Sequence, residues 1–233
     1  IIILDNNLSS ITRAVLYGRT VFKSIRKFIS LQLTMNLCAV GVSIICPFLG
    51  YDAPVTVVQM LWINIIMDTL GGLAFAGEAP SKNFMKVKPK RRDEPIMNRY
   101  MVNQIVILGS FTVALCLAFL LSPSITSRFR SSPDRIYHLT AFFALFIFTS
   151  VFNCFNARSD RLNLFASLSK NPPFIVIIAT VSAIQTAFIY LGSSVMRTVP
   201  LAPSHLALTV LLSLPVILFE FIRKLWQRLS PRK

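Results

Sequence analysis

The chain has 233 residues, of which 54% are hydrophobic and only 14% are charged, so it is too apolar for a soluble domain of this size. A net charge of +15 would suit nucleic acid, but the basic residues lie between the apolar runs and form no single basic face. This distribution excludes a nucleic-acid partner and indicates membrane topology. The four cysteines have no metal-binding or CxxC spacing and are interpreted as buried free thiols.

The stretch 1–27 is predicted to lie outside the membrane, as the end of a larger cytoplasmic domain. Ile1-Ile-Ile-Leu4 has the β propensity of a strand, and Asp5-Asn-Asn7 that of a turn or helix cap. From Leu8 to about Phe28, apolar and basic residues recur with helical spacing and predict an amphipathic stalk helix. Because the chain begins with Ile and shows no signal peptide, we expect it to be a piece of a longer product.

Six apolar runs follow in 28–233, each near the roughly 20 residues that cross a bilayer. They predict an all-α membrane protein with six transmembrane helices, at about 28–49, 54–76, 101–121, 136–156, 173–195 and 204–226. The last run contains Pro215, which a membrane helix tolerates with a kink.

Lys and Arg are divided unequally between the two sides that six spans define. One side, which includes both termini, carries 20 of these residues, and the other side carries 4. Cytoplasmic loops are the ones enriched in Lys and Arg, so both termini are expected in the cytoplasm.

Asn64 and Asp68 lie in the middle of the second apolar run. A carboxylate near the bilayer centre costs roughly 2.5–3.5 kcal/mol on insertion scales and is normally kept for an ion path or a buried partner. The two side chains are one helical turn apart on one face, and Gly71 and Gly72 follow and loosen the helix. This pattern predicts a site for a hard cation. In the first run Asn36 is open to two interpretations, an interhelical hydrogen bond or a further ligand facing this pair.

Other polar residues in the spans are interpreted as structural. Gln59 is expected to be solvated near the outer mouth, and Glu78 to be solvated or paired with the basic loop at the cytoplasmic surface. The hydroxyls of Thr149 and Ser150 are expected to bond their own backbone, and Glu220 to pack at a helix interface.

The segment 221–229 near the C-terminus is basic and amphipathic. It suits calmodulin or anionic lipid as a partner, although an anchor at the membrane surface explains it more simply.

Several segments, in this order along the chain, resemble P-type calcium pumps. They are Leu4-Asp-Asn-Asn-Leu-Ser-Ser10, Gly18-Arg-Thr-Val-Phe-Lys-Ser-Ile-Arg-Lys27, Gln32-Leu-Thr-Met-Asn36, Leu61-Trp-Ile-Asn-Ile-Ile-Met-Asp-Thr-Leu70, Ala76-Gly-Glu-Ala-Pro80 and Val151-Phe-Asn-Cys-Phe-Asn-Ala-Arg158. The resemblance implies the C-terminal part of such a pump, namely the end of the phosphorylation domain followed by membrane helices five to ten.

Within this family the resemblance is closest to the plasma-membrane type. Two-site pumps carry a glutamate, a threonine and an acid at the positions of Ala39, Met67 and Ser150 here. The resemblance therefore implies a single calcium site with Asn64 and Asp68 as ligands and Asn36 as a further candidate. Secretory-pathway pumps share much of this pattern, so manganese is the alternative ion, and the membrane is either the plasma membrane or an internal calcium store.

The sequence contains no phosphorylation motif, no dephosphorylation motif and no glycine-rich phosphate loop. ATP and magnesium are therefore expected to act only through domains outside this chain, which alone should not pump. Ligand counting agrees, because the three candidate side chains offer at most about four oxygens and calcium usually takes about 6–8. Two alternatives are a non-enzymatic membrane protein that assembles with or inhibits a full-length pump, and, with little support, a passive cation channel.

Overall fold

The computed structural model describes residues 7–51, 54–89, 94–129, 135–159 and 171–229, with the side chains of Met67, Asp68, Ser193 and Ser194 outside the description. Within these ranges the chain is helical and contains no strand. The strand predicted at Ile1-Ile-Ile-Leu4 lies outside the described residues. The helices are α1 (Leu8–Phe48), α2 (Val57–Ile66), η1 (Met67–Gly71), α3 (Gly72–Ala76), η2 (Lys82–Lys86), α4 (Arg99–Leu121), α5 (Pro123–Arg128), α6 (Ile136–Arg158), α7 (Pro172–Leu191), α8 (Ser193–Met196), α9 (Pro203–Ser213) and α10 (Pro215–Leu229).

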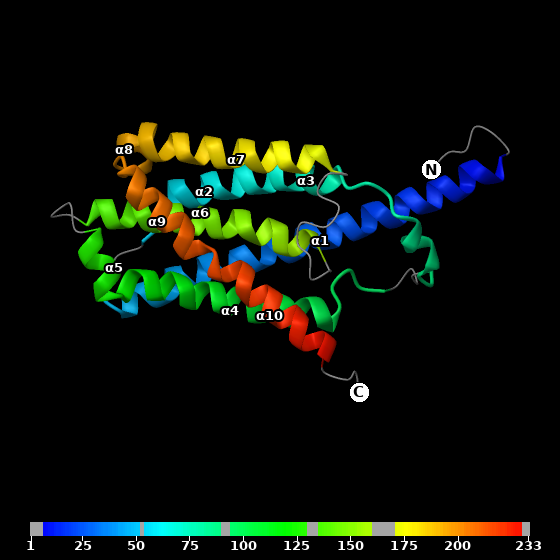
Figure 1. The fold of residues 1–233 in the computed structure, drawn as a ribbon, viewed down its shortest axis with the longest axis horizontal. Coiled ribbons are helices and arrows are strands. Elements are labelled where there is room, and N and C mark those ends of the chain that lie inside the picture. The colour runs from blue at the N-terminus through cyan, green and yellow to red at the C-terminus, as the bar shows by residue number, and fades with distance from the viewer. Residues whose placement is uncertain (1–6, 52–53, 90–93, 130–134, 160–170, 230–233) are drawn as a thin grey trace.

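Six helical stretches in the described part of the chain are long and apolar enough to cross a membrane. They follow the six predicted spans in order, so the prediction of an all-α membrane protein is confirmed. The first stretch is longer than predicted, because α1 runs through residue 28 as one helix of 41 residues and joins the stalk to the first span without a break. Figure 1 shows α1 extending beyond the bundle at the N-terminal end.

Asparagine side chains begin three of these helices. Asn7, Asn98 and Asn171 precede α1, α4 and α7, and each Oδ1 accepts a hydrogen bond from a backbone N–H in the first turn, at 2.9, 2.9 and 3.1 Å. Such caps satisfy donors that have no partner within the helix. The helix starts are therefore encoded locally in the sequence.

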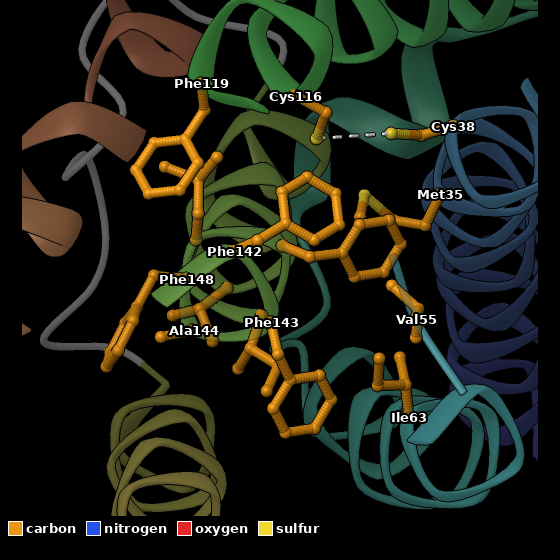
Figure 2. Packing of buried hydrophobic residues seen from close by; sticks show 14 of the residues in the cluster. Met35, Cys38, Val55, Ile63, Cys116, Phe119, Phe142, Phe143, Ala144 and Phe148 are labelled. Atoms are coloured by element: carbon orange, nitrogen blue, oxygen red, sulfur yellow. Dashed lines mark hydrogen bonds between the residues drawn. The ribbon is translucent and has the colours of Figure 1, made fainter. Parts of the chain in front are cut away.

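The core of the bundle is built around α6, which lies between the other long helices (Figure 1). It is buried along most of its length, as expected for a helix that is apolar on all sides. Its side chains pack against α1, α4 and α7, and Figure 2 shows Phe142 and Phe143 reaching toward Met35, Val55 and Ile63. This arrangement makes α6 the fixed centre against which the other helices are placed.

Small residues bring α1 and α4 close together. A Cβ added at Gly41 would lie 2.8 Å from Val113 Cγ2, and one at Gly109 would lie 2.6 Å from Leu37 Cδ2. Beside them, the Sγ atoms of Cys38 and Cys116 are 3.9 Å apart (Figure 2), and all four cysteines are free and buried, as predicted. Close backbone approach of this kind is how membrane helices gain packing energy.

The fifth and sixth predicted spans are interrupted in the structure. The fifth was expected to reach residue 195, but α7 ends at Leu191 and the chain turns at Gly192 before α8. A Cβ at Gly192 would lie 2.4 Å from the carbonyl oxygen of Phe188, so only glycine fits this turn. The sixth is divided at Leu214 into α9 and α10, where Pro215 begins the second half, as the predicted kink requires.

Candidate ion site and the contacts that hold it

The second span is an interrupted helix made of α2, η1 and α3. The π turn η1 covers Met67–Gly71, which includes Asp68 and begins three residues after Asn64, and Gly72 begins α3. A π turn widens the helix by one residue and is frequent at functional sites. The helix is therefore loosened next to the glycine pair, as expected. The loosened turn begins at Met67, about one turn before Gly71, and ends at Gly71.

Helix α7 holds the interrupted helix on both sides of the π turn. The ring centroids of Trp62 and Phe188 are 4.2 Å apart before the turn, and those of Phe75 and Phe174 are 6.1 Å apart after it. The turn is thus a local feature between two anchored segments.

The three predicted site residues lie on three elements, two of which belong to the interrupted helix. Asn64 is in the last turn of α2, Asp68 is in η1, and Asn36 is on α1, which packs against η1 and α3. The Asn36 and Asn64 side chains are exposed, and neither makes a hydrogen bond to a described residue, although Met35 next to Asn36 is buried. Asn36 therefore makes no interhelical hydrogen bond within the described part of the chain, and the Asn64 amide likewise has no hydrogen-bond partner among the described residues.

Two expectations about neighbouring polar groups were wrong. Gln59 is 4% exposed and not solvated: its Nε2 donates to the carbonyl oxygen of Met196 at 2.7 Å, and its Oε1 accepts from the N–H of Thr56 at 2.8 Å. The pattern Thr56-x-x-Gln59 is a capping box at the start of α2, a signal that the sequence carried. Thr149 and Ser150 are buried, but neither hydroxyl has a hydrogen-bond partner among the described residues.

Glu78 pairs with the stalk helix. Lys27 Nζ on α1 donates to both Glu78 carboxylate oxygens, at 2.8 and 2.7 Å, just after the end of α3. Phe28, the next residue of α1, lies against the π turn, since a Cβ at Gly71 or Gly72 would be 3.9 Å from its ring. The prediction that Glu78 is solvated or paired with the basic loop was wrong, because its partner is a basic residue of the stalk.

The loop after α3 is also fastened to α1. Arg19 Nη1 donates to the carbonyl oxygens of Phe84, Met85 and Val87 at 2.7, 3.3 and 2.7 Å, and the Lys23 ammonium lies 4.1 Å from the centroid of the Phe84 ring. A groove of about 210 Å³ runs between these residues. The segment that follows the interrupted helix therefore lies along the side of α1.

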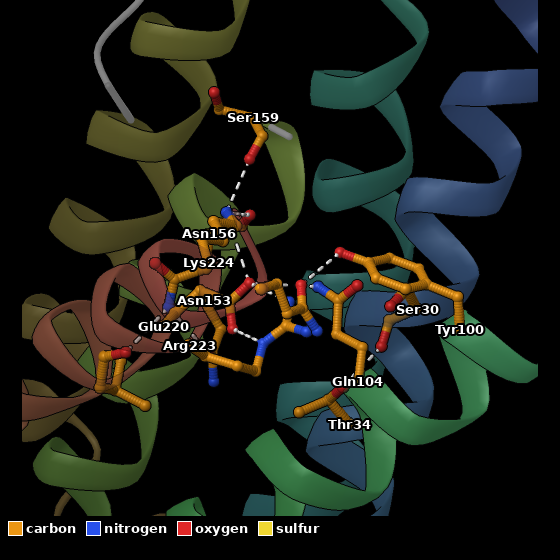
Figure 3. Close-up of polar contacts among 12 residues, drawn as sticks. Ser30, Thr34, Tyr100, Gln104, Asn153, Asn156, Ser159, Glu220, Arg223 and Lys224 are labelled. Carbon is orange, nitrogen blue, oxygen red and sulfur yellow. Dashed lines mark hydrogen bonds and ion pairs between the residues drawn. The ribbon is translucent and has the colours of Figure 1, made fainter. Parts of the chain in front are cut away.

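A second ionic cluster joins α10 to α4 and α6 (Figure 3). The Glu220 carboxylate is fully buried and accepts from Arg223 Nε and Nη2, both at 2.7 Å, and lies 3.4 Å from Lys224 Nζ. Lys224 also donates to the carbonyl oxygens of Asn156 and Ser159 at the end of α6, at 2.9 and 2.7 Å. The expectation that Glu220 is an interface group is confirmed.

The buried cluster includes part of the C-terminal segment 221–229, for which calmodulin, anionic lipid or an anchoring role was predicted. Two of its three basic side chains, those of Arg223 and Lys224, are buried in the cluster, and the exposed residues around them are largely apolar. A helix with buried basic groups and an outward apolar face suits an anchor in the membrane better than a peptide for calmodulin.

Taken together, the six candidate spans, the π turn and its amide and carboxylate residues define a polytopic membrane protein with a discontinuous helix suited to ion binding. The chain matches the family described as cation transporting ATPase, C-terminus, over residues 52–226. It belongs to this family.

Curated relatives agree with this assignment. The chain is 37% identical over 199 residues to calcium-transporting ATPase 5, plasma membrane-type, from Oryza sativa subsp. japonica, a match that covers 82% of this chain and 18% of that protein. It is 36% identical over 197 residues to calcium-transporting ATPase 10, plasma membrane-type, from Arabidopsis thaliana, covering 83% and 18%. It is 34% identical over 211 residues to plasma membrane calcium-transporting ATPase 2 from Oreochromis mossambicus, covering 86% and 19%. The chain thus spans about a fifth of the length of these relatives.

Proposed function

We propose that this chain is the transmembrane, cation-binding part of an ATP-driven calcium pump. The observation that carries the proposal is the π turn at Met67–Gly71, placed between Asn64 and Gly72 in a segment that resembles calcium pumps. Widening of a membrane helix frees backbone carbonyls next to side-chain oxygens, which is the ligand chemistry that calcium requires.

In this proposal Asp68 supplies the charge that holds a single calcium ion, and Asn64 and Asn36 complete part of its shell. The exposure of the two amides supports the assignment, because an amide facing hydrocarbon costs several kcal/mol unless it is covered. Another membrane segment, with oxygen ligands of its own, would cover them and raise the ligand number toward the roughly 6–8 that calcium takes.

The same proposal places both termini in the cytoplasm, where the stalk formed by α1 meets the domains that bind ATP and magnesium and become phosphorylated. Phosphorylation there would move α1 and change the access of the site from one side of the membrane to the other. The chain alone is then inactive, and the pump that contains it resides in the plasma membrane.

The test is Asp68→Asn in a complete pump that contains this segment. We expect calcium-dependent phosphorylation from ATP to be abolished, while expression and phosphorylation from inorganic phosphate without calcium persist. The same assay run with manganese in place of calcium decides between the two ions. Unchanged calcium dependence in the variant would remove Asp68 from the site and refute the proposal.

A further inference from the structure

One ion pair joins the stalk helix to the cytoplasmic end of the interrupted helix. Lys27 and Glu78 are 51 positions apart in the chain, and their side chains are 13% and 20% exposed. Because both groups are largely withdrawn from water, their two hydrogen bonds at 2.8 and 2.7 Å are stronger than those of a surface pair. The pair is therefore a firm connection between the two elements.

The connection has a second point, one residue further along α1. The Phe28 ring lies beside the stretch from the π turn to the end of α3, since a Cβ added at Gly71 or Gly72 would be 3.9 Å from it, and Phe28, Gly72 and Glu78 line one pocket. Phe28 thus lies beside this stretch at the π turn, and Lys27 contacts it through Glu78, just after the end of α3. Since α1 is a continuous helix over Leu8–Phe48, a displacement of its N-terminal part would reach this stretch, and the Lys27–Glu78 pair is its charged connection among the described residues.

On its other side Glu78 faces the end of α6 and the start of α7. Arg158, the last residue of α6, lies within the electrostatic reach of the Glu78 carboxylate. A Cβ at the neighbouring Gly77 would be 3.4 Å from Asn171 Oδ1, so the chain before Glu78 is confined by α7. Glu78 thus lies between α1, which supplies Lys27, and the neighbouring ends of α6 and α7.

We infer that Glu78 and Lys27 are positioning residues of the pump, whose ion pair transmits movement of the stalk to the π turn and so sets the affinity of the ion site. This inference rests on the proposed function. A merely structural pair would hold the chain together without affecting the concentration of calcium that the site requires, so the two roles give different results in one assay.

The experiment uses a complete pump that contains this segment, with the variants Glu78→Gln, Lys27→Met, both together, and the exchanged pair Lys27→Glu with Glu78→Lys. Arg13→Met is the control, because Arg13 is on the same helix, exposed, and loses the same charge. The readouts are the calcium concentration for half-maximal phosphorylation from ATP, the maximal phosphoenzyme level, and inhibition by vanadate. Asp68→Asn is measured in parallel.

Each single variant is expected to raise the half-maximal calcium concentration about tenfold and to shift vanadate inhibition, as loss of one charge-assisted contact predicts. The double variant should be no worse than either single one, because the two residues act through one contact, and the exchanged pair should recover part of the loss. The control should match the wild type.

Unchanged half-maximal calcium in both single variants, or effects that multiply in the double variant, would overturn the inference. Loss of phosphoenzyme with an unshifted calcium midpoint would likewise reduce the pair to a structural role. If Asp68→Asn abolishes calcium dependence while Glu78→Gln has no effect, only this inference fails. If Asp68→Asn has no effect, the proposed function fails.

Discussion

Replacing Glu220 by glutamine tests the buried cluster that holds α10. The carboxylate is fully buried, accepts two hydrogen bonds from Arg223 at 2.7 Å and lies 3.4 Å from Lys224 (Figure 3). Glutamine has nearly the same shape but no charge, and its NH₂ group would point at cationic donors. The variant therefore leaves two buried cations without a counter-charge while changing the packing very little.

The expected loss is large. Removing one partner of a buried ion pair typically costs about 3–5 kcal/mol, because the remaining charge stays desolvated. Gln104 Nε2, which donates to the carboxylate at 3.4 Å, offers no compensation, since an amide cannot neutralise a cation. For a chain of this size about 1 kcal/mol corresponds to roughly 2–4 °C, so the melting temperature should fall by about 6–20 °C.

The assay is thermal unfolding of the purified chain in detergent, followed by circular dichroism and by loss of tertiary fluorescence. Arg228→Ala is the matched control, because Arg228 is on the same helix but exposed, and it should change the melting temperature by no more than a degree or two. Adding Arg223→Gln to Glu220→Gln should cost less than the sum of the two single changes. A melting temperature for Glu220→Gln equal to that of the control would show that the cluster is hydrated and would refute the reasoning.

The glycines of the first two spans provide two further predictions. Gly41→Ala should destabilise the chain by about 1–3 kcal/mol, because Val113 is stiff in a helix and α1 must move away from α4. Adding Val113→Ala should recover part of this loss. Gly18→Ala, where the added Cβ meets nothing, should stabilise the chain by about 0.5–1 kcal/mol in the same melting assay. Gly72→Ala meets only ordinary contacts with Phe28, so it should leave the melting temperature of the chain unchanged or higher. In the complete pump, Gly72→Ala should lower calcium-dependent phosphorylation severalfold by stiffening the π turn, and an unaltered calcium dependence would contradict the role given to the turn.

The number, order and approximate limits of the spans could be predicted because each depends on a local property. Apolar length marks the spans, asparagine caps mark several starts, and Pro215 marks the break between α9 and α10. The burial of Gln59 could not be predicted from its depth in the span, since its acceptor at Met196 is 137 positions away. Its capping box with Thr56 was local and was the available signal.

In the candidate site, too, some features follow from the local sequence and others depend on contacts with distant parts of the chain. Asn64 and Asp68 were found as polar residues in an apolar run, and the glycine pair after them indicated a weakened helix. The position of the π turn, in contrast, depends on Trp62, Phe75 and Phe28 packing against other helices, and pairwise spacing contains no such information. The partner of Glu78 was ambiguous for the same reason, because several basic residues share its side of the membrane and only the fold selects Lys27.

The contacts of the basic residues also bear on the proposed orientation. Among the 20 Lys and Arg on the side assigned to the cytoplasm, seven described residues are engaged in specific contacts: Arg19, Lys23, Arg26, Lys27, Arg158, Arg223 and Lys224. A residue held in this way has a structural reason to be basic, so it is weaker evidence for topology than a free loop charge. Setting these seven aside leaves thirteen against the four of the opposite side, one of which, Arg135, lies over the Tyr51 ring. The asymmetry therefore does not arise from the ion pairs, and it still favours cytoplasmic termini.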